Sequence, residues 1–252
     1  MATRIDQIVG DIYRISHWSE ESGITFNQFL IADERPALIH TGRYDDYENV
    51  RAAIAEVLDP SKLEYVILLH FEADECGGMD RFAETALDSV LAGSWLSIEV
   101  NLRRWNYRGR LQGFKQGDRL DLGRHKLRFL ETPHVHHWDS MMVFDDTTKS
   151  LFPADLFMQA GDQPPIVTEN LGSEMCALYR YLGIFAHEEP VRSVVEAIGR
   201  LQPDWVHAMH GGTLTADSLP YFVRALKEQP FAFKGQLIGR PIELIERNAR
   251  RT

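Results

Sequence analysis

Residues 68–78, with the sequence LLHFEADECGG, place one histidine and three acidic side chains directly after an apolar run. Imidazole and carboxylate groups are ligands that proteins offer to iron, manganese and zinc ions. His70, Glu72 and Asp74 are therefore candidate metal ligands at the end of a buried strand. The alternative interpretation is a polar loop that binds no metal.

Three further stretches also end a predicted strand with side chains that could bind a metal. They are TPHVHHWDSM at 132–141, LFPADLF at 151–157 and HAMHGG at 207–212. A single histidine at the end of a strand is more often an ordinary polar residue than a ligand. Four such stretches, with imidazoles and carboxylates at the same relative position, predict one shared site.

The elements that would position these side chains are short strands and helical stretches. Residues 65–69 form an apolar run of strand length, and apolar spacing predicts a helix over 78–92, so the first motif lies on a strand-to-helix turn. Ligand sites commonly lie at such turns, outside the carboxyl ends of strands. The remaining strand-like runs are 11–18, 25–33, 36–42, 94–100, 114–123, 125–135, 140–157 and 204–212, and the other helical stretches are 46–58, 188–201 and 218–228.

Turn-forming residues connect several of these runs. DLGRHK at 121–126 and DDTTKS at 145–150 predict hairpin turns, and GDQPP at 161–165 predicts a surface loop. The order of strands, helix, strands and helix favours two sheets packed face to face with helices outside, rather than a regular parallel alternation.

Length and composition are typical of one globular domain. The chain has 252 residues and 44% hydrophobic content, enough for a sizeable core. The net charge of −10 argues against nucleic acid and anionic membranes as partners and favours a small molecule or a protein. No apolar run reaches the length of a membrane span and no signal peptide is recognisable, so we expect a cytoplasmic protein. Cys76 and Cys176 cannot form a disulfide framework, which suits a reducing compartment.

The candidate ligands together resemble those of the metallo-β-lactamase fold, and within it the flavodiiron proteins and the stand-alone oxygen-binding diiron proteins. The hydrolases of this fold carry H-x-H-x-D-H, whereas the flavodiiron pattern is H-x-E-x-D, then a histidine before D-S-M, an aspartate and a late His-Gly. FNQFLIAD and ALIHTG also resemble the opening strands of the fold. The resemblance implies an α/β protein, an αββα sandwich, with one diiron domain over residues 1–252. The matching positions are His70, Glu72, Asp74, His136, Asp155 and His210.

The resemblance implies that His70, Glu72 and His136 hold one iron, that Asp74 and His210 hold the other, and that Asp155 bridges them. It implies two iron ions bridged by an oxo, hydroxo or peroxo group, with zinc or manganese as the alternative, and no catalytic residue beyond the ligands. A glutamate in place of the second histidine is a harder, anionic ligand, which favours iron or manganese over zinc.

The histidine cluster leaves the third ligand position ambiguous. On an extended segment His134 and His136 would point to one face and His137 to the other. An ungapped match to the family pattern selects His136, which leaves His134 near the pocket and His137 on the surface or in packing.

Three other residues near the motifs are candidates for contacts with the ligands. Glu75 replaces a histidine ligand of the hydrolases and could ligate, hydrogen-bond a ligand or face solvent, and we expect one of the last two. His40 replaces a common aspartate before Thr-Gly, so a usual carboxylate partner of a ligand is missing. Cys76 lies beside the motif, where it either tunes the site or packs.

The implied function is binding of dioxygen by a diferrous centre that becomes diferric-peroxo, for oxygen sensing or for reduction of O2 or NO with an external electron donor. A homodimer and a signalling protein as a further partner are also implied. The C-terminal residues offer no phosphate-cradling loop, so we expect no bound FMN in this chain. Trp138, Phe71 and Phe157 could restrict water near the site or simply pack in the core.

Two other functions stay open from the sequence. The first is a binuclear hydrolase of the metallo-β-lactamase superfamily, in which a metal-bound hydroxide attacks an ester or phosphodiester, and Glu72 weighs against it. The second is a metal-free binding module, which would make six matched positions incidental.

Overall fold

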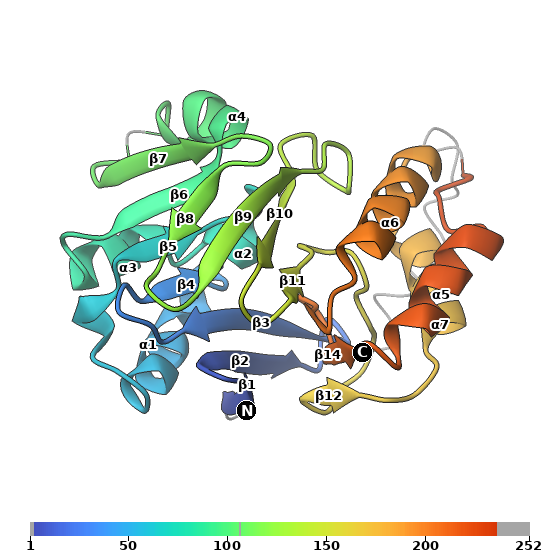
Figure 1. The fold of residues 1–252 in the computed structure, drawn as a ribbon, viewed down its shortest axis with the longest axis horizontal. Helices are drawn as coiled ribbons and strands as arrows, with labels where there is room; N and C mark the ends of the chain where they lie inside the picture. The colour runs from blue at the N-terminus through green and yellow to red at the C-terminus, as the bar shows by residue number, and fades with distance from the viewer. Residues whose placement is uncertain (1–2, 106, 236–252) are drawn as a thin grey trace.

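The computed structural model describes residues 3–105 and 107–235, and within them two mixed sheets pack face to face with helices on both outer sides (Figure 1). This is the predicted αββα arrangement. One domain over residues 1–252 stays a prediction. We expect no flavin-binding loop in the C-terminal segment. Most of that segment is residues 236–252, which lie outside the described residues.

The first sheet comes from the N-terminal half of the chain. Its first four strands pair antiparallel and its last four pair parallel. In order of pairing, the strands are β1 (Arg4–Val9), β2 (Ile12–Ser19), β3 (Ile24–Ile31), β4 (Ala37–Ile39), β5 (Tyr65–Ile67), β6 (Val90–Ser94) and β7 (Arg110–Phe114).

The second sheet follows along the chain and is also mixed. In order of pairing, its strands are β12 (Ile166–Val167), β14 (Thr213–Thr215), β13 (Trp205–His207), β11 (Ser150–Phe152), β10 (Met141–Asp145), β9 (Lys126–Glu131) and β8 (Arg119–Asp121). Strand β12 pairs parallel with β14 and β13 pairs parallel with β11, and the other neighbouring strands of this sheet pair antiparallel. The predicted turns at 121–126 and 145–150 join β8 to β9 and β10 to β11, both antiparallel pairs. The predicted loop at 161–165 contains no helix or strand.

The helices cover the two outer faces of the sandwich. Figure 1 shows α5, α6 and α7 together on one side of the molecule and α1 and α3 on the other. The helices are α1 (Tyr47–Ala55), α2 (Ala73–Cys76), α3 (Met79–Thr85), α4 (Trp95–Ser97), α5 (Gly172–Leu182), α6 (Glu189–Leu201) and α7 (Leu219–Glu228), with the short turns η1 (Tyr44–Asp46), η2 (Pro60–Lys62) and η3 (Ile98–Leu102).

The chain packs in three apolar layers, as an αββα sandwich requires. The layer between the sheets includes Phe29 and Ile67 from the first sheet and Phe129 and Phe152 from the second. A second layer packs α1 and α3 on the first sheet. The third packs α5, α6 and α7 on the second sheet. Strand β5 lies between two parallel neighbours and is buried throughout, which explains why its sequence is a continuous apolar run.

Two local predictions were wrong, and one helix was missed. The helix expected over 78–92 ends at Thr85, and Val90–Ser94 is the buried parallel strand β6. The strand expected at 94–100 is instead helical in α4 and η3. Helix α5 was not predicted, although its buried Met175 and Tyr179 lie four residues apart, the spacing of one helix face.

No helix within residues 3–105 and 107–235 is both long enough and apolar enough to cross a membrane.

Candidate metal centre

Four loops that follow strands of the two sheets bring imidazole and carboxylate groups together. His70 follows β5, and His136, Asp155 and His210 follow β9, β11 and β13 of the second sheet. Seven side chains meet there in two groups, each with ligand atoms within 4.8 Å of one another. The first group is His70, Glu72, His136 and Asp155, and the second is Asp74, Glu75 and His210.

In the first group, two carboxylates lie close to the Nε2 atoms of two histidines. Glu72 Oε2 lies 3.2 Å from Nε2 of both His70 and His136. Asp155 Oδ2 lies 2.8 Å from His136 Nε2 and 3.6 Å from His70 Nε2. Two atoms bound to one metal at about 2.1 Å are about 3.0–3.6 Å apart, so these four side chains fit one cation.

The second group has one histidine and two carboxylates. His210 Nε2 lies 3.8 Å from Asp74 Oδ2 and 3.6 Å from Glu75 Oε1. Asp155 also reaches this group, because its other oxygen, Oδ1, lies 3.5 Å from His210 Nε2. Asp155 therefore presents one oxygen to each group, which is the position of a bridging carboxylate.

Burial and the acidic side chains of the cluster shift the pKa values of its members. Burial and the neighbouring Asp155 raise the pKa of Glu75 well above its ordinary value. The pKa of His136 rises to about 10 although burial opposes its charge, because Asp155 and Glu72 accept hydrogen bonds from it. Ligating histidines must be neutral and ligating carboxylates ionised, so a bound metal would displace the protons held here.

His210 is held with one ring nitrogen turned to the cluster. Its Nδ1 donates to the Thr25 carbonyl at 2.9 Å, which leaves Nε2 facing the acids. The next residue, Gly211, has a φ of +111°, and a Cβ there would lie 2.7 Å from Gln159 Oε1, so glycine is required. Asn27 Nδ2 donates to the Gly211 carbonyl at 2.7 Å and fixes the loop.

His40 lies directly behind His70. Its ring is buried, centred 5.8 Å from the His70 ring, and its Nε2 accepts from the Leu69 backbone N–H at 3.1 Å. Burial and the nearby His70 lower the pKa of His40 well below its ordinary value, so the ring is neutral. His40 thus positions the chain that carries His70.

The structure places one of the other two histidines of the cluster differently from the sequence interpretation. His134 is exposed, with a φ of +66°, so the segment is not extended and its side chains do not alternate. His137 is partly exposed and packs beside the centre, as the expected packing role allows, with its ring 5.8 Å from that of His70 and Nδ1 2.5 Å from Asp139 Oδ1.

Glu75 and Cys76 are both buried. Only 2% of Glu75 is exposed, so the expectation that allowed it to face solvent is wrong in that respect. Burial raises the pKa of the Cys76 thiol to about 12, so the thiol is protonated at neutral pH.

A pocket of about 290 Å³ opens beside the first group. It is lined by Glu72 and Cys76 together with the apolar Phe71, Met79 and Trp105. Of the aromatic residues expected near the site, Phe71 thus borders the pocket. Phe157 is fully buried in the apolar layer between the second sheet and helices α5, α6 and α7.

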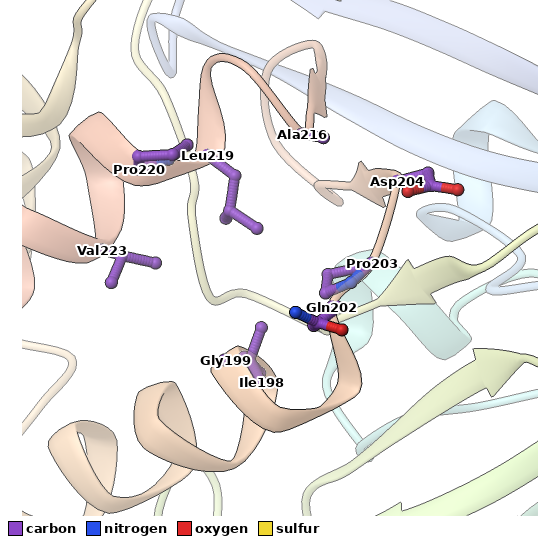
Figure 2. A pocket seen from close by; sticks show the side chains of 9 residues that line it. All are labelled: Ile198, Gly199, Gln202, Pro203, Asp204, Ala216, Leu219, Pro220 and Val223. Carbon is purple, nitrogen blue, oxygen red and sulfur yellow. The ribbon is translucent and has the colours of Figure 1, made fainter.

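A second pocket, of about 390 Å³, lies away from the centre between α6 and α7. Figure 2 shows Ile198, Leu219 and Val223 pointing into it from the two helices. None of the candidate ligands lines it.

Solved structures of flavodiiron proteins share this fold. The chain superposes on rubredoxin:oxygen oxidoreductase from Desulfovibrio gigas with a TM-score of 0.80 and 22% identity, covering 89% of this chain and 61% of that one. It superposes on the Flv1 flavodiiron core from Synechocystis with a TM-score of 0.78 and 23% identity, covering 90% and 62%.

Sequence relatives carry related descriptions. A rubredoxin-oxygen oxidoreductase of Megalodesulfovibrio gigas is 30% identical over 138 residues, which is 54% of this chain and 34% of the relative. A nitric oxide reductase of Moorella thermoacetica is 30% identical over 145 residues, 56% of this chain and 36% of the relative. The chain thus spans about a third of the length of these curated relatives.

A family model described as ODP family beta lactamase matches residues 24–211, which contain all seven side chains of the centre. With the metallo-β-lactamase fold and the flavodiiron relatives, this match shows that the chain belongs to the ODP family of beta-lactamase-like proteins.

Proposed function

We propose that this chain is a non-haem diiron protein that binds dioxygen. His70, Glu72 and His136 would hold one iron, Asp74 and His210 the other, and Asp155 would bridge them. The observation that carries the proposal is the division of the Asp155 oxygens, with Oδ2 toward His70 and His136 and Oδ1 toward His210.

The donor set supports iron over zinc. The two groups contain three imidazoles and four carboxylates, and oxygen-rich ligand sets suit harder ions than the histidine-rich sets of zinc hydrolases do. When bound, a reduced iron pair would supply electrons and open coordination positions for a small gas molecule.

The surrounding residues support access for a small apolar ligand. The pocket beside Glu72 is also lined by Asp80, and the apolar Phe71, Met79 and Trp105 form much of its wall, which favours a small uncharged ligand such as O2 or NO over an anionic substrate. Reduction beyond simple binding would require an external electron donor. We propose such a donor, or a signalling protein, as a partner. We also propose that the chain is a single domain and that it forms a homodimer.

The test is the visible spectrum of the anaerobically reduced, iron-loaded protein before and after O2 is admitted. We expect a new charge-transfer band, absent from the Asp155→Ala variant. A spectrum unchanged by O2 in protein with a full iron load would contradict oxygen binding. Ester or phosphodiester hydrolysis by the zinc-loaded protein would then favour a hydrolase.

Sensing and reduction differ in turnover. With reduced rubredoxin as the electron source, continuous O2 or NO consumption would support a reductase. Consumption that stops after one equivalent per centre would support a sensor.

A further inference from the structure

Glu75 is a buried carboxylate whose backbone is anchored independently of the metal centre. It lies in the short helix α2, and its carbonyl accepts from the Thr41 backbone N–H at 2.6 Å and from Thr41 Oγ1 at 2.8 Å. Thr41 follows β4, next to the strand that leads to His70. The sheet therefore holds the Glu75 main chain while the side chain extends into the cluster.

The two carboxylate oxygens of Glu75 face different groups. Oε2 lies 3.5 Å from His70 Nε2, and Oε1 lies 3.6 Å from His210 Nε2. Asp155 divides its oxygens in the same way, at 3.6 Å from His70 Nε2 and 3.5 Å from His210 Nε2. The two carboxylates thus occupy nearly equivalent positions between the same two histidines.

Glu75 is not placed as a residue that merely orients a histidine. A carboxylate with that role accepts from the ring nitrogen remote from the metal. In His210 the remote nitrogen, Nδ1, already donates to Thr25, and Glu75 faces Nε2, the nitrogen that points to the cluster. Glu75 Oε2, like Asp155 Oδ1, is also buried without a hydrogen-bond partner among the described atoms.

We propose that Glu75 is a second bridging carboxylate, with Oε2 on the metal of the first group and Oε1 on the metal of the second. The inference rests on the proposed function, because it requires two metals in the centre. Glu72, Asp74, Glu75 and Asp155 would then carry four negative charges, equal in number to the positive charges of two divalent ions.

The inference distinguishes Glu75 from a ligand of one metal. A terminal ligand at this position could be replaced by a histidine, which binds through one nitrogen. A bridge could not, because an imidazole that keeps its proton on the other nitrogen offers only one donor atom.

The direct test is a crystal structure of the wild-type protein soaked anaerobically with iron(II), with the metals located by anomalous scattering at the iron edge. We expect Oε1 and Oε2 each within about 2.3 Å of a different iron, the usual range for carboxylate oxygen bound to a metal. Both oxygens on one iron, or neither within about 3 Å of any iron, would overturn the bridge.

Iron binding by variants provides a second readout in solution. We expect Glu75→Gln and Glu75→His each to weaken binding of both irons by about 10-fold or more, the scale of lost metal-site interactions. Glu56→Gln, at an exposed position, is the control and should bind as the wild type does. Wild-type iron binding by the Glu75→His variant would refute the bridge.

The two proposals fail in different ways. Wild-type protein that holds fewer than two irons would contradict the proposed diiron function itself. Wild-type protein with two irons, whose Glu75→Gln variant binds iron equally tightly, would contradict only the bridge. Circular dichroism of the metal-free variants establishes that they fold, and the wild-type crystal structure decides the question if they do not.

Discussion

Glu72 lies 3.2 Å from the Nε2 atoms of both His70 and His136, at the position where the hydrolase pattern has a histidine. Hydrogen bonds from His136 and His70 lower its pKa below the ordinary value, so it is ionised at neutral pH. At the scale of single residues, we expect this carboxylate to favour iron over zinc.

Replacement of Glu72 by histidine should shift metal preference toward zinc. The change removes a hard anionic ligand and adds an imidazole, which zinc binds well. After competition with equal iron(II) and zinc(II), we expect the zinc-to-iron ratio to rise about 10-fold, an effect on the scale of other metal-site substitutions. Elemental analysis measures the ratio, with Glu84→His, at an exposed position, as control. An unchanged ratio would contradict the assignment of Glu72 as a ligand.

The short element that carries Asp74 and Glu75 packs tightly against the loop before α1. Gly77 follows α2, and a Cβ there would lie 2.4 Å from the Tyr44 backbone nitrogen and 2.6 Å from the Ala73 carbonyl oxygen. Helix α2 can therefore hold its two acids in place only because Gly77 has no side chain.

Gly77→Ala should destabilise the protein by about 2 kcal/mol, in the range of overpacked cores, and weaken metal binding by displacing α2. Gly199→Ala is the matched control, because beyond the backbone of its own helix and its chain neighbours no atom lies within 4 Å of a Cβ at that exposed position. It should stabilise by about 0.5–1 kcal/mol through helix propensity. Urea denaturation with and without metal measures the stability of each variant and the contribution of metal to it. Equal effects of the two substitutions would contradict the packing argument.

The hairpin turn between β10 and β11 depends on one buried carboxylate. Asp145 accepts hydrogen bonds from His125 Nδ1 at 2.8 Å and from Thr148 Oγ1 at 2.6 Å, and it also accepts from the Thr147 and Thr148 backbone N–H groups. Burial opposes its charge, but these bonds lower the pKa of Asp145 to about 2.

Asp145→Asn should destabilise the protein by about 1–3 kcal/mol at neutral pH, the scale of lost charged hydrogen bonds. Because the folded pKa is depressed, this stabilisation is complete above the unfolded pKa near 4 and is lost as pH falls toward about 2. Denaturation at several pH values should show the difference from wild type narrowing below about pH 4. A difference independent of pH would show that another interaction is responsible. Asp88→Asn, at an exposed position, is the control.

The sequence located the strand ends that carry the ligands because imidazoles and carboxylates after apolar runs are visible in the chain. It misplaced the boundary after Thr85 because a short, fully buried strand such as Val90–Ser94 has the same apolar pattern as a buried helix. It also misplaced His134, which is exposed, since the positive φ there breaks the alternation that an extended segment would have. The burial of Glu75 depends on contacts between distant segments, which no local pattern reports.

At the scale of the whole molecule, the centre joins the two sheets. Residues 70–75 follow β5 of the first sheet, whereas His136, Asp155 and His210 follow strands of the second. A metal bound by both sets would connect the two halves of the sandwich, and binding to the folded state alone stabilises it by mass action.

Removal of metal should therefore lower the melting temperature. Free metal at 100 times its dissociation constant adds about 2.7 kcal/mol to the free energy of unfolding at 25 °C. Calorimetry should show a higher melting temperature with iron(II) than after treatment with a chelator in the wild type, and no such difference in Asp155→Ala. A melting temperature unaffected by chelation of a fully loaded protein would contradict the connecting role.

The most direct measurement of the central claim is the number and identity of metal ions per chain in protein purified anaerobically and supplied with iron, manganese and zinc together. The diiron account predicts two ions per chain, with iron in excess of zinc, and loss of both ions in Asp155→Ala because that side chain faces both groups. One ion per chain, or two zinc ions, would contradict it.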